Sequence, residues 1–154
     1  MCIRAVGHGW SVCLIQFVKG GWRCGEIQGL KRLAPGVELH IVGEGFVGIL
    51  DDSRDFEQHL QAAGKGVVLA LDKLYSGKHQ LVILDELNVA HSLGLVSREE
   101  IEEILAAKGE RQHLVITGRG ATDWLLKKAD LVTEMKEIKH PFQDGIPAQK
   151  GIDW

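Results

Sequence analysis

The sequence has 154 residues, of which 45% are hydrophobic and 25% charged, as is usual for a chain with a packed core. Eighteen basic and 21 acidic residues give a formal net charge of −3. This composition excludes a disordered or collagen-like chain, and the near-balance of charge argues against nucleic acid or an anionic membrane as the main partner. The length predicts one domain spanning residues 1–154.

Three cysteines, Cys2, Cys13 and Cys24, are an odd number without C-x-x-C spacing. They predict neither a disulfide framework nor a structural zinc site, and they fit a reducing cytoplasm. Cys13 lies in an apolar run and is expected to pack as a small core residue. The longest apolar run, about seven residues, is too short to span a membrane. Gly7, His8 and Gly9 come soon after Arg4, where a signal peptide would have its apolar region, so a signal peptide is not expected.

Short β-type runs alternate with helical patterns along the chain. Strands are expected at residues 12–18, 37–42, 81–84, 113–117 and 131–135. Helices are expected where apolar residues recur at steps of three and four from Phe56 to Leu74, after a capping box at residues 97–100, and over residues 124–129. This alternation predicts βαβ crossovers and a mostly parallel sheet. Ligands of such sheets bind beyond the carboxyl ends of the strands, so the residues just after each strand are the candidates for chemistry.

Two acidic residues, Asp85 and Glu86, directly follow the apolar strand expected at 81–84. This is the Walker B pattern, in which a buried strand carries a carboxylate to a Mg²⁺ ion that bridges phosphate oxygens. Acidic residues also end strands for solvation or to cap the next helix, and the pattern alone leaves both interpretations open.

Glycine-rich segments follow three other strands, at residues 19–22, 43–46 and 117–120. The segment Thr117-Gly118-Arg119-Gly120 allows a close backbone approach to a ligand and offers the Arg119 guanidinium to a phosphate, although a tight turn with an exposed arginine is the alternative. Phe46 lies after Gly43-Glu44-Gly45, where its ring can stack on a flat ligand or fold back onto the core.

Basic residues and histidines give weaker signals. The segment from Lys136 to Gly151 combines three lysines and His140 with two prolines, which fits either a solvated surface or a defined loop near an anionic ligand. The other histidines are scattered, with no H-x-x-x-H or H-E-x-x-H pair, so a catalytic metal held by histidine is not expected.

Taken together, these segments resemble the ATP:corrinoid adenosyltransferases of the P-loop type. The resemblance is colinear over nearly the whole chain and rests on residues 4–9, 12–20, 43–46, 84–87, 117–120, 129–135, 139–142 and 145–152. It implies an α/β fold of the P-loop NTPase (RecA-like) type, with a mostly parallel sheet and helices on both faces. It also implies transfer of the 5′-deoxyadenosyl group from ATP to the cobalt of a reduced corrinoid, with release of triphosphate, in a homodimer that works with an electron-donating reductase.

The resemblance implies roles for particular residues. Glu86, with Asp85 beside it, would hold Mg²⁺ or Mn²⁺, and the nucleotide side would be formed by Arg4, Gly118, Arg119 and Gly120. Phe46 would be a wedge beneath the corrin ring that helps displace the lower ligand of cobalt and so makes Co(II) easier to reduce. His140 and Phe142 would lie on the corrinoid side.

The sequence departs from the family pattern in two places, and each departure leads to an expectation about function. The glycine-rich loop G-x-x-x-x-G-K-[ST] and the first strand, which precede Arg4 in the family, are not in the 154 residues, so weak ATP binding is expected of this chain alone. Gly48 stands where the family usually has a tryptophan two residues after the phenylalanine. A non-catalytic corrinoid- or nucleotide-binding relative that has lost the phosphate loop, or a decayed reading frame, is therefore the alternative.

Overall fold

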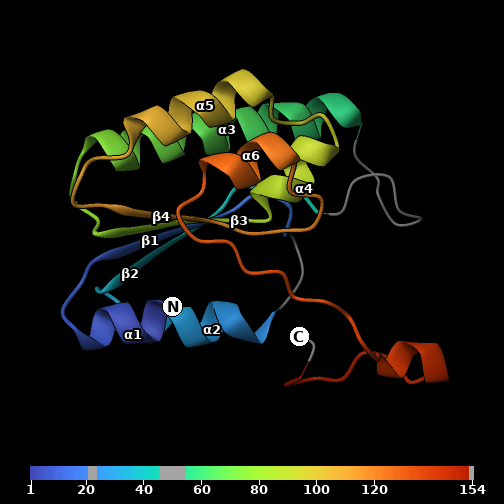
Figure 1. Ribbon diagram of the computed structural model, residues 1–154. Helices are drawn as coiled ribbons and strands as arrows, with labels where there is room; N and C mark the ends of the chain where they lie inside the picture. Colours follow the sequence, from blue (N-terminus) through green and yellow to red (C-terminus); the bar gives the residue numbers. More distant parts are fainter. Residues whose placement is uncertain (21–23, 46–54, 153–154) are drawn as a thin grey trace.

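Four strands form one parallel sheet in the computed structural model, which describes residues 1–20, 24–45 and 55–152 (Figure 1). The sheet order is β2-β1-β3-β4, and every neighbouring pair is parallel. The strands are β1 (Val12–Gln16), β2 (Val37–Ile41), β3 (Leu81–Asp85) and β4 (His113–Ile116). The expected parallel α/β architecture is confirmed, and four of the five expected strands are formed.

Helices cover both faces of the sheet (Figure 1). One face carries α3 (Phe56–Tyr75), α4 (Leu87–Ser92), α5 (Arg98–Ala107) and α6 (Asp123–Lys128). The opposite face carries α1 (Cys2–Gly7) and α2 (Gly25–Lys31). A buried apolar cluster lies on each side, and β1 contributes to both because its residues alternate between the two faces.

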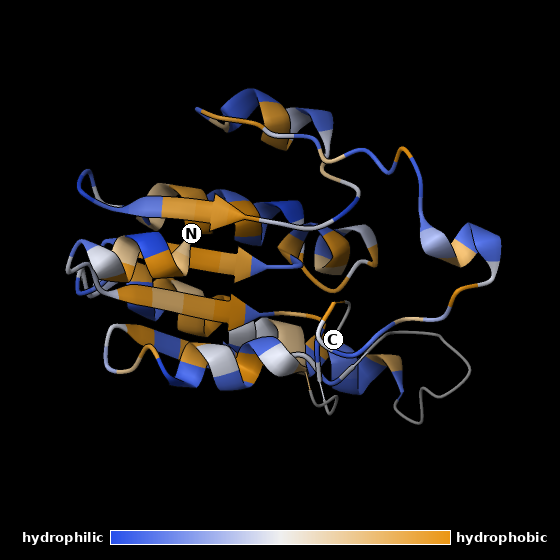
Figure 2. Cartoon of the chain, turned by 90° about the horizontal axis from the view of Figure 1, so that it is seen from below, coloured by the Kyte–Doolittle hydropathy of each residue, from blue (hydrophilic) through white to orange (hydrophobic). Residues whose placement is uncertain are grey.

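The two central strands are apolar along their length because neither face of the sheet meets water. All five residues of β1 are buried, as are residues 81–84 of β3. Figure 2 shows this as strand arrows coloured almost entirely for hydrophobic residues. Polar side chains on these strands are therefore confined to their carboxyl ends, where ligands of parallel sheets bind.

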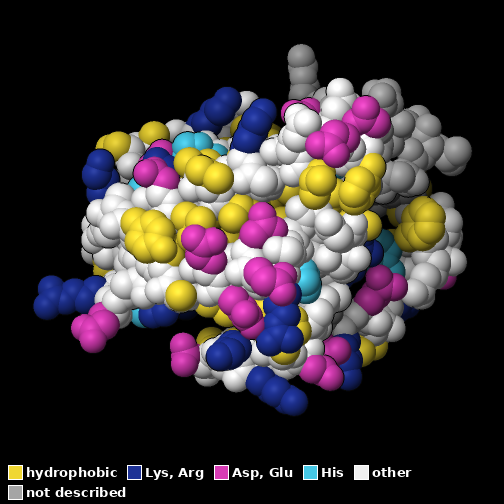
Figure 3. Space-filling view, turned by 90° about the horizontal axis from the view of Figure 1, so that it is seen from above, with side chains coloured by type: hydrophobic (Ala, Val, Ile, Leu, Met, Phe, Trp, Pro, Cys, Tyr) yellow, Lys and Arg dark blue, Asp and Glu magenta, His cyan; other side chains and the backbone are white. Residues whose placement is uncertain are grey.

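The two long helices begin at capping boxes. Asp55 accepts a hydrogen bond from the Gln58 backbone N–H at the start of α3, and Ser97 accepts one from Glu100 at the start of α5. Figure 3, which looks onto this face, shows charged side chains interspersed with apolar ones. Among the described residues, no helix has both the length and the apolar character needed to cross a bilayer.

Two glycines inside α3 have different surroundings. A methyl group at Gly66 would lie 2.8 Å from both the Phe17 ring and a Val42 methyl, whereas one at Gly64 would have no described residue within 4 Å. Gly66 therefore lets the helix approach the sheet closely, and Gly64 only weakens the helix.

We expect Gly66→Ala to lower the free energy of unfolding by about 1–3 kcal/mol, because the buried Phe17 must move. Gly64→Ala should raise it by about 0.4–1 kcal/mol, because alanine restricts the unfolded chain and favours helix. Urea denaturation of both variants checks the pair. Equal effects would show that packing does not require Gly66.

The expected strand at residues 131–135 is not formed. Leu131 is 85% exposed and Met135 93% exposed, and no ladder pairs this segment with the sheet. A β-type run becomes a strand only when a neighbouring strand forms hydrogen bonds with its backbone N–H and C=O groups. The local sequence pattern does not show whether such a neighbouring strand is present. Figures 1 and 2 show the chain leaving α6 and running away from the sheet to the short 3₁₀ helix η1 (Pro141–Asp144).

Candidate active site at the carboxyl edge

The carboxyl ends of the two central strands place Gln16 and Asp85 side by side, since they are register partners in β1 and β3. The buried Gln16 amide donates to Asp85 Oδ2 at 3.2 Å, and the Thr117 hydroxyl donates to Oδ1 at 2.8 Å. Both oxygens of Asp85 are thus held in place by neutral donors, which fix the carboxylate and leave its charge uncompensated.

Glu86 has the left-handed conformation, with φ 62° and ψ 21°, and is the one non-glycine residue with positive φ in the described part of the chain. Its backbone N–H donates to the Thr117 hydroxyl at 3.1 Å. A strained residue kept at the end of a strand, beside a second carboxylate, points to a functional role. Burial and the charge of Asp85 raise the pKa of Glu86, while Arg119 and Lys19 act in the opposite direction.

The loop after β4 lies directly against this carboxylate pair. Gly118 has φ +117°, and a methyl group there would lie 3.2 Å from the Glu86 Cα and from the Asn88 Cβ. The Asn88 amide donates to the Gly118 carbonyl at 3.2 Å. Arg119 is exposed, and its charge acts on Glu86. The sequence-predicted Asp85, Glu86 and residues 117–120 are therefore neighbours in space.

Two buried amide oxygens have no hydrogen-bond partner among the described residues: Gln16 Oε1, whose amide nitrogen contacts Asp85, and Asn88 Oδ1, whose amide nitrogen contacts Gly118. Together with the two carboxylates and the Thr117 hydroxyl, they make a donor set built from oxygen. Hard divalent cations such as Mg²⁺ and Mn²⁺ take oxygen ligands and offset paired carboxylate charges. The residues at this edge therefore fit a magnesium-type ion.

Sequence reasoning identified the carboxylates but assigned no role to Gln16, Lys19 or Asn88. Gln16 is aligned with Asp85 by the register of β1 and β3, which the sequence pattern alone does not give. Lys19 pairs with Glu26 at 2.7 Å and lies close enough for its charge to lower the pKa of Glu86. No sequence signal singles out Asn88, because its contact with Gly118 arises only when the fold brings α4 against the loop that follows β4.

The loops that follow β1 and β2 also meet at this edge. The Val42 and Gly43 N–H groups both donate to the Gln16 carbonyl, at 3.0 and 3.1 Å. A side chain at Gly20 would overlap the backbone of Gly43 and Gly45, so both glycine segments are needed for this approach. Phe46, Gly48 and the rest of residues 46–54 lie outside the described residues.

Three other predicted residues are not brought to the carboxyl edge. Arg4 is exposed on α1, on the other face of the sheet from α4 and α6. His140 accepts a hydrogen bond from the Phe142 backbone N–H and caps η1, and the Phe142 ring is 74% exposed. Figures 1 and 2 both show η1 apart from the sheet, so the roles of these residues stay predictions.

Comparison with known proteins identifies the family of this chain. A sequence model of the family described as ATP:corrinoid adenosyltransferase BtuR/CobO/CobP matches residues 1–154. A corrinoid adenosyltransferase of Pseudomonas aeruginosa is 37% identical over 154 residues, which is all of this chain and 74% of that protein. Corrinoid adenosyltransferases of a Sinorhizobium species and of Escherichia coli are 33% and 36% identical, over 100% and 98% of this chain and 72% and 74% of their own lengths. The chain therefore belongs to the ATP:corrinoid adenosyltransferase family, an enzyme family of the α/β class found in the structure.

Proposed function

We propose that this chain serves the transfer of the 5′-deoxyadenosyl group from ATP to the cobalt of a reduced corrinoid, in adenosylcobalamin synthesis or salvage. In this reaction a Co(I) centre attacks the 5′ carbon of ATP. The cobalt–carbon bond forms with the cobalt electron pair, and the carbon–oxygen bond breaks with its pair leaving on triphosphate. The observation that carries the proposal is the Asp85–Glu86 pair at the end of β3, facing Arg119, in a chain of this family.

In this proposal Asp85 and Glu86 hold Mg²⁺ or Mn²⁺. When bound, the ion would supply positive charge to the leaving triphosphate. The chain's own work is positioning: Gln16 and Thr117 orient the Asp85 carboxylate, and the Thr117 hydroxyl also fixes the Glu86 backbone. Such preorganised charge lowers the barrier without reorganising during the reaction.

On the nucleotide side we assign Gly118, Arg119 and Gly120, with Arg4 as a more distant contributor. Gly118 permits the close approach of the loop to Glu86, and Arg119 presents a fork of N–H donors suited to phosphate oxygens. Arg4 would have to reach the nucleotide from α1, and this assignment rests on the family resemblance alone.

On the corrinoid side we assign Phe46, His140 and Phe142. The loop after β2 is tied to the Gln16 carbonyl, so the chain enters residue 46 from a segment held at the carboxyl edge. Phe46 would exclude water and the lower ligand from cobalt. Phe46 should therefore affect the reaction mainly when the substrate is Co(II), because Co(II) must lose that lower ligand before an electron-donating reductase can reduce it.

We also propose a homodimer working in the cytoplasm. The three cysteines form no disulfide, which suits a reducing compartment. After α6 the chain exposes large apolar side chains that a second copy would cover: Leu131, Val132, Met135, Ile138, Phe142 and Ile152. Sedimentation velocity measures this directly, and a monomer at micromolar concentration would contradict it.

The central experiment uses the chain preceded by a glycine-rich phosphate-loop segment of the G-x-x-x-x-G-K-[ST] type, here called the extended protein. With MgATP and chemically reduced cob(I)alamin it should form the adenosyl–cobalt bond and release one triphosphate per adenosyl group. The 154-residue chain alone should turn over far more slowly, because the backbone N–H groups of that loop cradle the phosphates. Binding of both substrates without product would support the non-catalytic alternative.

A further inference from the structure

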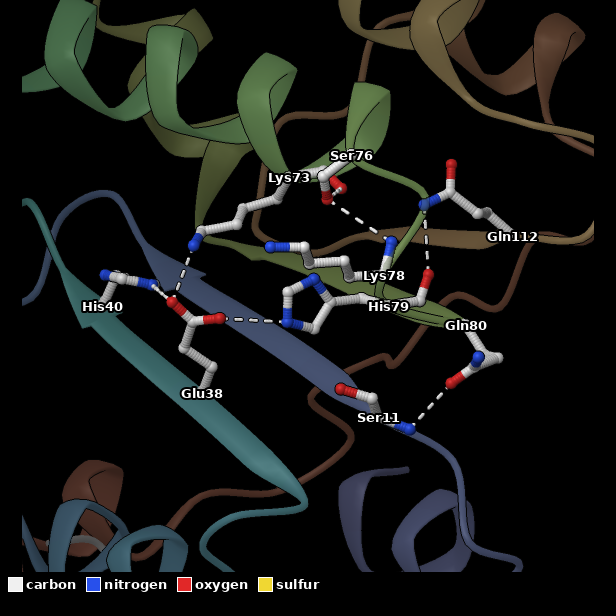
Figure 4. A network of polar contacts seen from close by, with 9 residues as sticks. All are labelled: Ser11, Glu38, His40, Lys73, Ser76, Lys78, His79, Gln80 and Gln112. Atoms are coloured by element: carbon white, nitrogen blue, oxygen red, sulfur yellow. Dashed lines mark hydrogen bonds and ion pairs between the residues drawn. The ribbon is translucent and has the colours of Figure 1, made fainter.

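A second polar cluster lies at the amino end of the sheet, opposite the carboxylate pair (Figure 4). Cys13 and Glu38 are register partners near the start of β1 and β2, and His40 follows two residues later on the same face of β2. The Cys13 sulfur, a Glu38 carboxylate oxygen and a His40 ring nitrogen all lie within 4.8 Å of one another. Thiol, carboxylate and imidazole are the three ligand types that zinc takes in proteins.

Glu38 is the centre of this cluster. One of its oxygens lies 2.7 Å from His40 Nε2 and 2.7 Å from the Lys73 ammonium, and the other lies 3.0 Å from His79 Nε2. The Lys73 hydrogen bond lowers the pKa of Glu38 to about 2, so this carboxylate is ionised at neutral pH. Figure 4 shows His40, Lys73 and His79 converging on it from β2, α3 and the turn before β3.

His79 borders this cluster. Its side chain is 6% exposed and its Nε2 atom is aimed at Glu38, while its Nδ1 atom has no hydrogen-bond partner among the described residues. A buried imidazole that holds a carboxylate in place is typical of the outer shell of a metal site. Cys13 is wholly buried, so its thiol faces the protein interior.

We propose that Cys13, Glu38 and His40 form a binding site for a borderline-soft divalent cation of the zinc type, with His79 holding the Glu38 carboxylate in place. A thiolate and a carboxylate with a neutral imidazole balance the charge of such an ion. This donor set separates the site from the all-oxygen set at the carboxyl edge, which suits magnesium.

The geometry requires only local closure. Ligand atoms around tetrahedral zinc lie roughly 3–4 Å apart, so the cluster must contract from its present span. Cys13 is held by the core, whereas the Glu38 side chain is 40% exposed and that of His40 29% exposed. These two side chains can adjust, and their exposure gives the ion a path from solvent.

Lys73 occupies the position of the counter-charge in the metal-free chain. Its ammonium is bound to the Glu38 oxygen that also contacts His40, so it competes with an incoming cation for that carboxylate. It must turn away when the ion enters. Removing it should therefore strengthen metal binding, an outcome opposite to that of removing a ligand.

The test measures Zn²⁺ affinity of the 154-residue chain by competition with a chromophoric chelator, and Co²⁺ absorption as a report of thiolate ligation. We expect one Zn²⁺ per chain and a thiolate-to-cobalt charge-transfer band. Cys13→Ser and His40→Gln should each weaken Zn²⁺ binding by about 10–100-fold. Cys24→Ser, the matched control for a cysteine outside the cluster, should change it by less than about threefold, and Lys73→Met should tighten it by about tenfold.

Several outcomes overturn the proposal. One is a charge-transfer band that survives in Cys13→Ser, and another is Zn²⁺ affinity that is equal in all four variants, as for adventitious surface histidines. Circular dichroism checks that each variant folds. If Cys13→Ser does not fold, His40→Gln decides, because its partly exposed side chain can be replaced without disturbing the core, and unchanged affinity in that variant rejects the site.

Discussion

Glu86→Gln in the extended protein is expected to lower the adenosylation rate about 10–100-fold and to raise the Mg²⁺ concentration needed for half-maximal activity. The amide keeps the size and shape of the side chain but removes the charge that faces the cation. Raising the Mg²⁺ concentration should therefore restore part of the lost rate. Activity measured against Mg²⁺ and against MgATP separates a metal defect from a nucleotide defect.

The same substitution should leave the fold as stable or make it more stable in the absence of metal. Glu86 is half-buried and lies beside Asp85, so its charge opposes folding when no cation is present. A melting temperature in EDTA that is unchanged or higher, combined with lower activity, is typical of a functional carboxylate.

Glu102→Gln is the matched control, since Glu102 is an exposed acid on α5 that pairs with Arg98 at 2.9 Å. It should change neither the rate nor the Mg²⁺ dependence. If Glu86→Gln lowers the melting temperature markedly and added Mg²⁺ gives no rescue, the residue has a structural role and the metal assignment is wrong.

Local sequence patterns were sufficient to predict the strand and the loops that form the site. Apolar continuity identified β3, and the rule that ligands bind beyond the carboxyl ends of parallel strands selected Asp85 and Glu86 and the glycine segment at 117–120. The structure confirms that these residues meet, with Glu86 and Thr117 hydrogen-bonded across two loops. What joins them is the parallel order of β3 and β4, which strand–helix alternation already implies.

Contacts that depend on register between strands were not predictable in the same way. Glu38 and His40 are two residues apart on β2, but their meeting with Cys13 requires β1 to pair with β2 at one particular offset. His79 joins them from a turn more than thirty residues away along the chain. A histidine that appears isolated in sequence can therefore belong to a cluster, and motif spacing alone does not reveal it.

The error at residues 131–135 has a related cause. Alternation and apolar content describe a segment that fits a sheet, but pairing supplies the hydrogen bonds that make it a strand. Residues 131–135 pair with no strand of the described sheet, and the Leu131 and Met135 side chains stay exposed. The same exposure is what supports a second copy as its partner.

Gly118→Ala is expected to lower both the stability and the activity of the extended protein. With φ +117°, alanine is strained whatever the space, and its methyl would press on the Glu86 Cα, the Asn88 Cβ and the Val89 nitrogen, each at 3.2 Å. Backbone strain of this kind costs about 1–3 kcal/mol, which corresponds to a fall of roughly 5–10 °C in melting temperature near the upper end of that range.

Activity of the extended protein should fall further than stability does. The loop can relieve the contact only by moving away from Glu86, which lengthens the hydrogen bonds that join Thr117 to Asp85 and to the Glu86 backbone. Displacement of a positioning group by about 1 Å costs on the order of 100-fold in rate. The Mg²⁺ dependence should shift in the same direction as in Glu86→Gln, because both changes disturb the same pair of carboxylates.

Gly120→Ala is the matched comparison in the same loop. Its φ of +77° lies in the left-handed region that other residues occasionally adopt, and a methyl there would meet only the Ser92 side chain, at 3.4 Å. We expect a cost of about 1–2 kcal/mol and little change in Mg²⁺ dependence. If the two alanine variants melt alike and lose activity alike, strain is shared along the loop, and the close approach of Gly118 to Glu86 does not set the geometry of the carboxylate pair.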